Sequence, residues 1–388
     1  MNPLTNDVDS IPSELRGHVP ALDGLRGLAV LLVLVFHIAQ SEVAPSGGIA
    51  RAFYGATRIG QTGVDLFFVL SGFLITGILY DTKASPRYFF NFYGRRTLRI
   101  FPLYYGVLIA AFVLTPALFG IGPVGVNPIW LWTYTANLPA TFGVEGGTFG
   151  HFWTLAIEEQ FYLVWPAVIF AFGRRRLMGV CLGCIAGAAA IRVVMEIYGF
   201  SSFTFTLARM DSLTLGAWLA LAARGPLGMA GWRGKAWVTS IVTAGLAAPI
   251  YLANSGSGAA WLQVFKYSLI GVFYGSILVL AVTSRWAAVP FRSAMLRWLG
   301  KYSYGLYVFH PLFIMLAARM TMGMLDPGWA LASRVGIIVA GSMATAWLSW
   351  HLYEKRFLAW KSLFVDTTPT TASDRTRPRM PAQVAVAP

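Results

Sequence analysis

Two ionisable side chains lie eleven positions apart in one apolar segment of this 388-residue chain. Arg26 and His37 belong to the run ALDGLRGLAVLLVLVFHIAQ, in which Asp23 precedes both. Eleven residues of an α-helix return to almost the same face, with an axial offset of roughly 16 Å. Both side chains are therefore predicted to face one polar lumen at different depths, which suits an elongated ligand.

A thioester that carries phosphates, such as acyl-CoA, has that elongated shape. Arg can hold a phosphate or a carbonyl oxygen through two parallel hydrogen bonds. His titrates near neutral pH and can take a proton from an attacking hydroxyl. We therefore expect His37 and Arg26 to be catalytic, and Arg26 also to contact the donor. A snorkelling Arg and a packing His would show the same spacing.

A second basic motif, RRTLR, occupies a segment expected to be a cytoplasmic loop. Arg96 and Arg99 are three residues apart, which makes them neighbours on one helical face. Two guanidinium groups on one face can hold phosphates at the cytoplasmic mouth of the lumen. We expect both to bind the donor, and ordinary anchoring of a cytoplasmic loop is the alternative.

Carboxylates are costly inside a membrane, so those in apolar segments are functional candidates. Glu158 and Glu159 lie in the run HFWTLAIEEQFYLVWP, and on a helix they point about 100° apart. We expect one of them to face the lumen and to orient the imidazole or hold acceptor hydroxyls. The alternative is an intramembrane ion pair with Arg192 or Arg209.

Four further residues have structural interpretations of their own. Glu354 precedes two basic residues, so a surface ion pair is expected, with donor binding as the alternative. His310 precedes Pro311, which frees a backbone carbonyl that the imidazole could satisfy. Asp65 is expected at the outer membrane surface. Ser71 lacks the Gly-x-Ser-x-Gly context of a hydrolase nucleophile.

Apolar stretches of roughly 20 residues must position these side chains across a bilayer. Of all residues, 56% are hydrophobic and only 12% are charged, whereas soluble domains have about 25% charged residues. We therefore predict an all-α bundle of about ten transmembrane helices. The expected spans are residues 21–40, 63–80, 103–120, 152–172, 178–198, 211–223, 237–253, 264–283, 302–320 and 333–352.

The charges indicate the orientation of the bundle. With the N-terminus in the cytoplasm, the inside segments hold 22 of the 30 Lys and Arg residues. The positive-inside rule then predicts that both termini are cytoplasmic. The net charge of +14 therefore reflects topology and not nucleic-acid binding.

The flanking segments differ from the membrane domain, which we place at residues 21–360. Residues 1–20 and 361–388 are polar or rich in Pro, Thr and Ala, so we predict disordered cytoplasmic ends. Polar residues precede the first apolar segment, and no cleavable signal peptide is expected. Cys181 and Cys184 lie among glycines, which favours helix packing, and no metal site is predicted.

These positions together resemble the membrane acyltransferase-3 family, over about residues 20–360. The family motifs are Arg-ten residues-His, Phe-Phe-x-x-Ser-Gly-Phe-Leu, paired arginines, Glu-Glu-Gln-Phe-Tyr and a closing Tyr-Glu. The matching positions are Arg26 and His37, residues 67–74, Arg96 and Arg99, residues 158–162, and residues 353–354. One departure is Arg356, where the family often has Pro.

The resemblance implies an integral O-acyltransferase of the bacterial inner membrane. Acyl-CoA, with acetyl as the acyl group, would be the donor substrate, and no permanently bound cofactor is implied. The acceptor would be a hydroxyl of a carbohydrate, a glycolipid, a polysaccharide or lipopolysaccharide precursor, or a macrolide. His37 would act as a base or carry the acyl group transiently. Some members carry a C-terminal extracytoplasmic esterase-like domain that this sequence lacks, so we expect direct delivery or a separate protein.

A glycolipid or small-molecule transporter is the alternative from another class, because it could use the same lumen without chemistry. The sequence shows no internal repeat, whereas many transporters are built from duplicated halves. The intramembrane pair of Arg26 and His37 also suits a thioester better than a coupling ion. These two observations favour the enzyme.

Overall fold

The structure is a computed structural model that describes residue 15 and residues 17–43, 47–120, 122–125, 127–144, 146–252 and 260–365. All regular elements in these ranges are helices, and no strand occurs in them. The all-α prediction is confirmed. The terminal segments predicted to be disordered lie mostly outside the described residues. Within the second of them, residues up to 364 form the short helix η9 (Trp360–Phe364), whose last carbonyl accepts a hydrogen bond from Arg95 Nε at 2.6 Å.

Ten α-helices of at least fourteen residues occur in the described ranges, and each corresponds to one predicted span. They are α1 (Pro20–Gln40), α3 (Gly63–Asp81), α4 (Tyr88–Ile109), α8 (Trp153–Ala171), α9 (Arg174–Ile197), α10 (Met210–Ala223), α11 (Arg233–Leu252), α12 (Ala260–Thr283), α15 (Ser303–Met320) and α16 (Pro327–Ser349).

Six helical segments among the described residues are long and apolar enough to cross a membrane. They are Pro20–Gln40, Gly48–Asp81, Tyr88–Leu118, Arg174–Ile197, Val264–Thr283 and Gly328–Phe364. Lipid offers no partner for backbone N–H and C=O groups, so helices, which pair these groups internally, are the solution expected there. The chain is therefore a multi-pass membrane protein, and the number of ten crossings stays a prediction.

The main departure from prediction concerns residues 88–102, which were expected to form a cytoplasmic loop. They are the first part of α4, which begins at Tyr88. Tyr88 and Phe92 are buried, and the Tyr88 hydroxyl donates to Pro166 O at 3.1 Å. The basic residues had suggested a loop, but the aromatic residues between them pack the segment against α8. Arg96 and Arg99 therefore belong to a helix.

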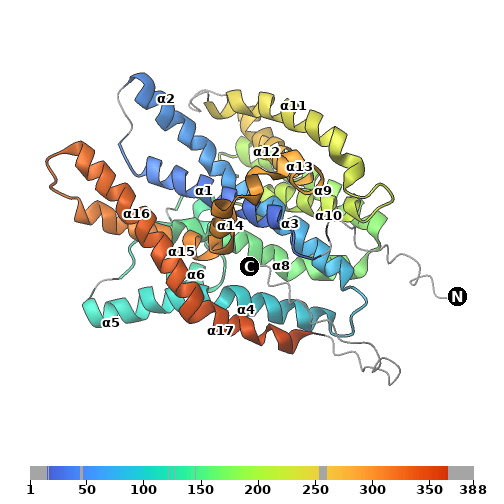
Figure 1. The fold of residues 1–388 in the computed structure, drawn as a ribbon, viewed down its shortest axis with the longest axis horizontal. Coiled ribbons are helices and arrows are strands. Elements are labelled where there is room, and N and C mark those ends of the chain that lie inside the picture. Colours follow the sequence, from blue (N-terminus) through green and yellow to red (C-terminus); the bar gives the residue numbers. More distant parts are fainter. Residues whose placement is uncertain are drawn as a thin grey trace.

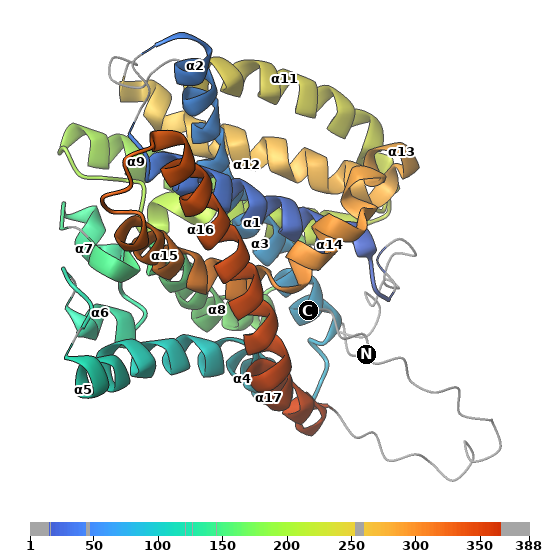
Figure 2. The same ribbon diagram turned by 60° about the vertical axis from the view of Figure 1, so that its left-hand side comes forward.

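Helices α1 and α3 occupy the middle of the bundle. In both ribbon views they lie between the α11 and α12 pair at one edge and α4 at the opposite edge (Figures 1 and 2). Helix α3 packs closely against α10, where a Cβ atom on Gly72 would lie 1.8 Å from Leu213 O. A Cβ on Gly216 would lie 2.0 Å from Val69 O. Small residues thus allow the two backbones to touch.

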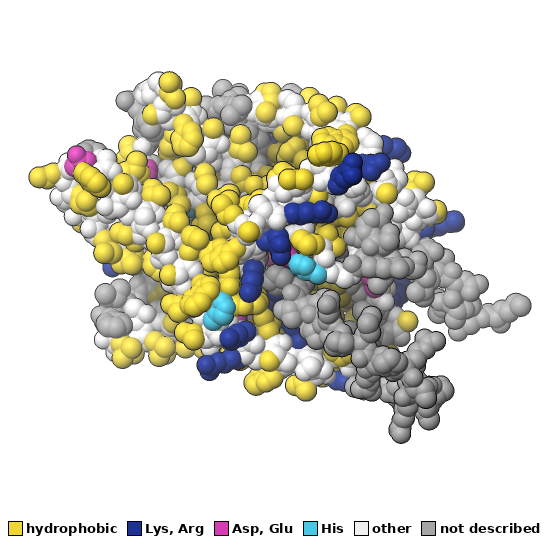
Figure 3. All heavy atoms as spheres, in the orientation of Figure 1, with side chains coloured by type: hydrophobic (Ala, Val, Ile, Leu, Met, Phe, Trp, Pro, Cys, Tyr) yellow, Lys and Arg dark blue, Asp and Glu magenta, His cyan; other side chains and the backbone are white. Residues whose placement is uncertain are grey.

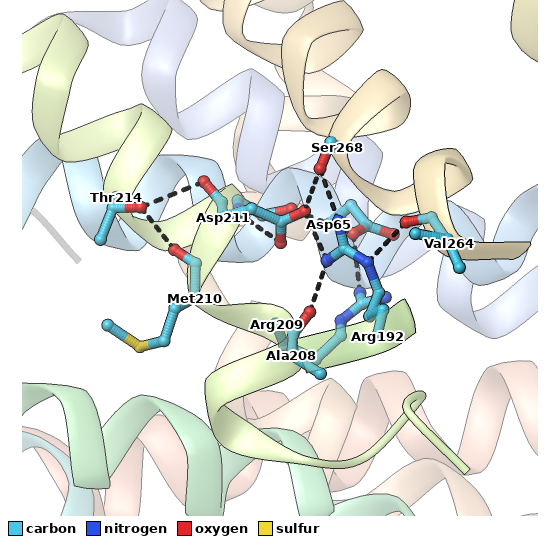
Figure 4. Close-up of polar contacts among 10 residues, drawn as sticks. Asp65, Arg192, Ala208, Arg209, Met210, Asp211, Thr214, Val264 and Ser268 are labelled. Carbon is cyan, nitrogen blue, oxygen red and sulfur yellow. Dashed lines mark hydrogen bonds and ion pairs between the residues drawn. The ribbon is translucent and has the colours of Figure 1, made fainter. Parts of the chain in front are cut away.

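Two buried ion pairs tie α3 and α9 to the short helix η5 (Thr206–Arg209) and to α10, which follows it (Figure 4). Arg192 Nη1 lies 2.8 Å from Asp211 Oδ2, and Arg209 Nη2 lies 2.7 Å from Asp65 Oδ1. Ser268 Oγ, from α12, donates to Asp211 at 2.6 Å. Both arginines have 0% exposure. Asp65 is therefore buried as an ion-pair partner, and the alternative in which Arg192 or Arg209 pairs with an α8 glutamate is excluded.

Breaking one of these pairs should destabilise the fold. Arg192→Ala should lower the free energy of unfolding by about 3 to 5 kcal/mol, because it leaves the Asp211 carboxylate buried and unpaired. Arg192→Met combined with Asp211→Leu should recover most of the loss, since no charge is then left uncompensated. Thermal unfolding in detergent would compare the variants. An equally large loss in both would contradict this account.

One face of the molecule is largely apolar apart from a basic band (Figure 3). Lys and Arg side chains follow a diagonal band across an otherwise largely hydrophobic face (Figure 3), where Figure 1 places α13 (Arg285–Ala288), α14 (Ala294–Lys301) and α17 (Lys355–Ala359). The exposed basic residues of this part of the chain are Arg285, Arg292, Arg297, Lys301, Lys355 and Arg356. Cations beside a lipid-facing surface are typical of a cytoplasmic membrane boundary.

Candidate active site

Polar side chains recur along the inward faces of helices that are otherwise apolar. On α8, Thr154, Glu158 and Tyr162 are spaced by four residues and share one face. On α15, polar residues recur every third position from Tyr304 to His310. Together with polar residues of α1, α3 and α4, these side chains form a row of polar groups inside the bundle, here called the polar path.

Three arginines, Arg26, Arg96 and Arg99, form an arginine cluster at one end of this path. Arg26 lies on α1, where its Nη1 donates to Asp23 Oδ1 at 3.3 Å. Arg26 and Arg96 both lie near enough to Arg99 for their positive charges to interact with its guanidinium group. The structure therefore brings the predicted residue of α1 together with the two predicted residues of α4.

Glu354 closes this end of the path. It is 6% exposed, lines a small cavity with Arg99 and accepts a hydrogen bond from Ser349 Oγ at 2.8 Å. The residue ends the π-helical turn η8 (Trp350–Glu354), a distortion frequent at functional sites. The predicted surface ion pair is wrong, because this carboxylate is buried whereas the two basic residues after it are exposed.

Arg96 is held by acidic and aromatic groups of α8. Its guanidinium carbon lies 3.9 Å from the centre of the Tyr162 ring, and its Nε lies 3.8 Å from Glu159 Oε1. Glu158, one residue earlier on α8, accepts a hydrogen bond from Ser71 Oγ of α3. Both glutamates thus lie along the polar path, although only one was predicted to face the lumen.

Three histidines, His37, His151 and His310, form a histidine cluster further along the path. His310 Nε2 of α15 lies 3.2 Å from His37 Nδ1 of α1, and the two ring centres are 4.9 Å apart. His151, from the short helix η4 (Gly147–Phe152), has its ring centre 5.4 Å from that of His310.

The imidazole of His37 thus has a second imidazole beside it, and not the predicted carboxylate. No hydrogen bond joins His37 to Glu158 or Glu159 in the part of the chain that the structure describes. The sequence interpretation overlooked His151. His151 lies seven positions before Glu158, a spacing that places two residues of a helix on nearly the same face, and this spacing was the available signal.

Tyr307 connects the two ends of the path. Its hydroxyl lies 2.6 Å from Thr154 Oγ1 and donates to His151 O at 2.5 Å. The side chain is buried. Polar groups therefore continue from the arginine cluster to the histidine cluster, as expected for an elongated ligand with a charged head and a reactive end.

A family model described as an acyltransferase domain matches residues 19–354. The chain belongs to this acyltransferase-3 family. The match includes all residues of the arginine and histidine clusters and ends at Glu354. It confirms the resemblance that the motifs had indicated and places the chain in a family of enzymes.

Several relatives of the chain are named as acyl-transferring proteins. Peptidoglycan O-acetyltransferase OatA of Listeria monocytogenes is 34% identical over 40% of this chain and 25% of that protein. Acyltransferase MdmB of Streptomyces mycarofaciens is 26% identical over 85% of this chain and 87% of that protein. O-acetyltransferase OatA of Staphylococcus aureus is 28% identical over 79% of this chain and 52% of that protein.

The chain thus matches a quarter of the length of the Listeria OatA protein and about half of the length of the Staphylococcus OatA protein. It matches most of the length of MdmB. No solved structure is significantly similar to it.

Proposed function

We propose that this protein is an integral membrane O-acetyltransferase that moves an acetyl group from acetyl-CoA to a hydroxyl of a carbohydrate, glycolipid or polysaccharide precursor. The observation that carries the proposal is the polar path, which has arginines at one end and histidines at the other. Membership of the acyltransferase-3 family and relatives named O-acetyltransferases support it.

The arginine cluster suits the phosphate-rich head of the donor. Guanidinium groups bind phosphates through paired, charge-assisted hydrogen bonds. Arg99 is the first candidate, because Arg96 already has an ion-pair partner in Glu159 of α8. The pantetheine arm would then follow α1 from Arg26 to His37, a distance of roughly 16 Å along the helix. The thioester would then lie at the histidine cluster.

In the proposed reaction, His37 takes the proton from the acceptor hydroxyl. The hydroxyl oxygen forms a bond to the thioester carbonyl carbon, and the carbon–sulfur bond breaks. The CoA thiolate leaves and receives the proton from His37, so that the products are an acetyl ester and CoA. A transient acetyl-histidine is the other use of the same ring. Mass spectrometry of rapidly quenched enzyme would detect it.

The acceptor is proposed to bind beside His151. The Nε2 atom of this residue is buried and has no hydrogen-bond partner among the described residues. Buried polar atoms are nearly always hydrogen-bonded, so a hydroxyl of a bound substrate is a suitable partner. A glycan offers many hydroxyls, and the Listeria relative is named a peptidoglycan O-acetyltransferase.

Labelled acetyl-CoA separates this function from glycolipid transport. Purified protein should release CoA and transfer label to an added glycan, and release should increase with glycan concentration. A transporter would move glycolipid across proteoliposome membranes and leave acetyl-CoA intact. Intact donor in the presence of several glycan classes would contradict the proposal.

We also propose that the protein lies in the inner membrane with both termini in the cytoplasm, where acetyl-CoA is made. The basic band on α13, α14 and α17 supports this orientation. A reporter that is active only outside the cytoplasm should stay silent when fused after residue 388. The same reporter inserted after residue 124, between the predicted spans 103–120 and 152–172, should be active, because this loop lies outside when the N-terminus is cytoplasmic. The reverse pattern would invert the topology.

A further inference from the structure

We propose that His310 is a positioning residue that keeps the proton of His37 on Nδ1 and leaves His37 Nε2 as the reactive atom. The proposal rests on the proposed function, since it assigns a role within that reaction. It starts from the backbone of α15, where a proline follows the histidine.

Pro311 determines where His310 carries its proton. Proline has no N–H, so the carbonyl of Tyr307, four residues earlier, loses its helical donor. His310 Nδ1 lies 2.9 Å from Tyr307 O and 3.1 Å from Leu306 O. Carbonyl oxygens only accept, so Nδ1 carries the hydrogen and donates it. In the neutral ring, Nε2 of His310 then has a lone pair.

That lone pair and the carbonyl of Val33 together hold the proton of His37 on Nδ1. His37 Nδ1 lies 3.0 Å from Val33 O and 3.2 Å from His310 Nε2. Both neighbours accept hydrogen bonds, so Nδ1 of His37 carries the hydrogen and is shared between them. Nε2 of His37 is therefore unprotonated, with its lone pair available to the acceptor hydroxyl. The two rings achieve this assignment without a carboxylate.

The hydrogen bond between His37 Nδ1 and His310 Nε2 should strengthen during the reaction. When His37 Nε2 takes a proton, the ring becomes cationic, and the hydrogen bond from its Nδ1 to His310 becomes charge-assisted. An interaction that is stronger in the transition state than in the ground state raises kcat and leaves substrate binding nearly unchanged. His310 should therefore affect turnover much more than donor affinity.

A purely structural role makes a different prediction. If His310 only satisfies the carbonyl freed by Pro311, its replacement should lower stability and should not act selectively on kcat. Two substitutions distinguish the roles. His310→Gln keeps an acceptor oxygen that can reach His37, whereas His310→Leu has similar bulk and no acceptor.

We expect His310→Leu to lower kcat at least about tenfold, because it removes the hydrogen bond to His37 that becomes charge-assisted in the transition state and leaves Val33 O as the acceptor for Nδ1. His310→Gln should retain most of the wild-type kcat. Affinity for acetyl-CoA should be unchanged in both variants. Equal losses in the two variants, or a parallel loss of donor affinity, would overturn the positioning role.

His37→Ala, measured in parallel, separates this inference from the proposed function. An inactive His37→Ala variant beside a fully active His310→Leu variant would refute the inference alone. Wild-type protein that never releases CoA would refute the function.

A direct measurement covers the case in which His310 variants fail to fold. The chain has five histidines, so nitrogen NMR of the histidine-labelled wild-type protein can assign the ring protons. We expect hydrogen on Nδ1 of His37 and of His310. Hydrogen on Nε2 of His37 would overturn the proposal.

Discussion

Replacing His37 with Ala should lower turnover by at least about 100-fold and leave acetyl-CoA affinity near its wild-type value. Positioned acid–base catalysis contributes about 100- to 10,000-fold to enzymatic rates, and His37 is the proposed base. Arg26, which belongs to the proposed phosphate-binding arginine cluster, lies roughly 16 Å from this ring along α1. Loss of the imidazole should therefore remove the chemistry and spare the binding.

Two other variants on α1 test whether the effect is specific. Arg26→Ala should weaken donor binding and turnover together, because Arg26 lies in the arginine cluster. Gln40→Ala removes a polar side chain three residues beyond His37 and should change neither. Product formation and donor affinity are measured on protein that elutes as a single species in size-exclusion chromatography. Turnover near wild type in His37→Ala would make His37 a packing residue and the mechanism wrong.

Replacing Arg99 with Ala should weaken acetyl-CoA binding by about 1.5 to 3 kcal/mol, which corresponds to roughly 10- to 150-fold. Arg99 lines the cavity next to Glu354 and shares its surroundings with two further arginines. A charged hydrogen bond to phosphate would be lost there. Lys at the same position should restore only part of the affinity, because it keeps the charge but not the paired donors.

Arg96 should behave differently from Arg99. Its removal leaves the Glu159 carboxylate without its ion-pair partner, so Arg96→Ala should reduce stability as well as donor affinity. Adding Glu159→Gln to Arg96→Ala should restore stability without restoring affinity.

Isothermal titration with acetyl-CoA measures the affinities of these variants. Arg285→Ala, which removes an exposed arginine outside the arginine cluster, serves as control. Unchanged affinity in a folded Arg96→Ala, Arg99→Ala double variant would show that both arginines are membrane anchors.

The membrane-spanning character of the chain was accessible from sequence alone. A helix in lipid needs roughly 20 apolar residues, and this requirement is local, so each long helix matches a predicted apolar stretch. The shared face of Arg26 and His37 follows in the same way from helical periodicity. The error at residues 88–102 arose because basic residues indicate a loop unless something packs their helix, and that packing comes from α8.

The pairing of charges was decided only by the tertiary structure. Arg209 could have met a glutamate of α8 or Asp65, and an apolar sequence does not indicate which helix lies beside which. The same holds for His37 and His310, which are 273 positions apart and meet across two helices.

Helix register explains this difference. The axial position of one helix against another depends on close backbone contacts such as those of Gly72 and Gly216, and a shift of one residue rotates a helix by about 100°. The partners of a buried polar group therefore depend on the packing of the whole bundle, whereas the face on which it lies depends on its own segment.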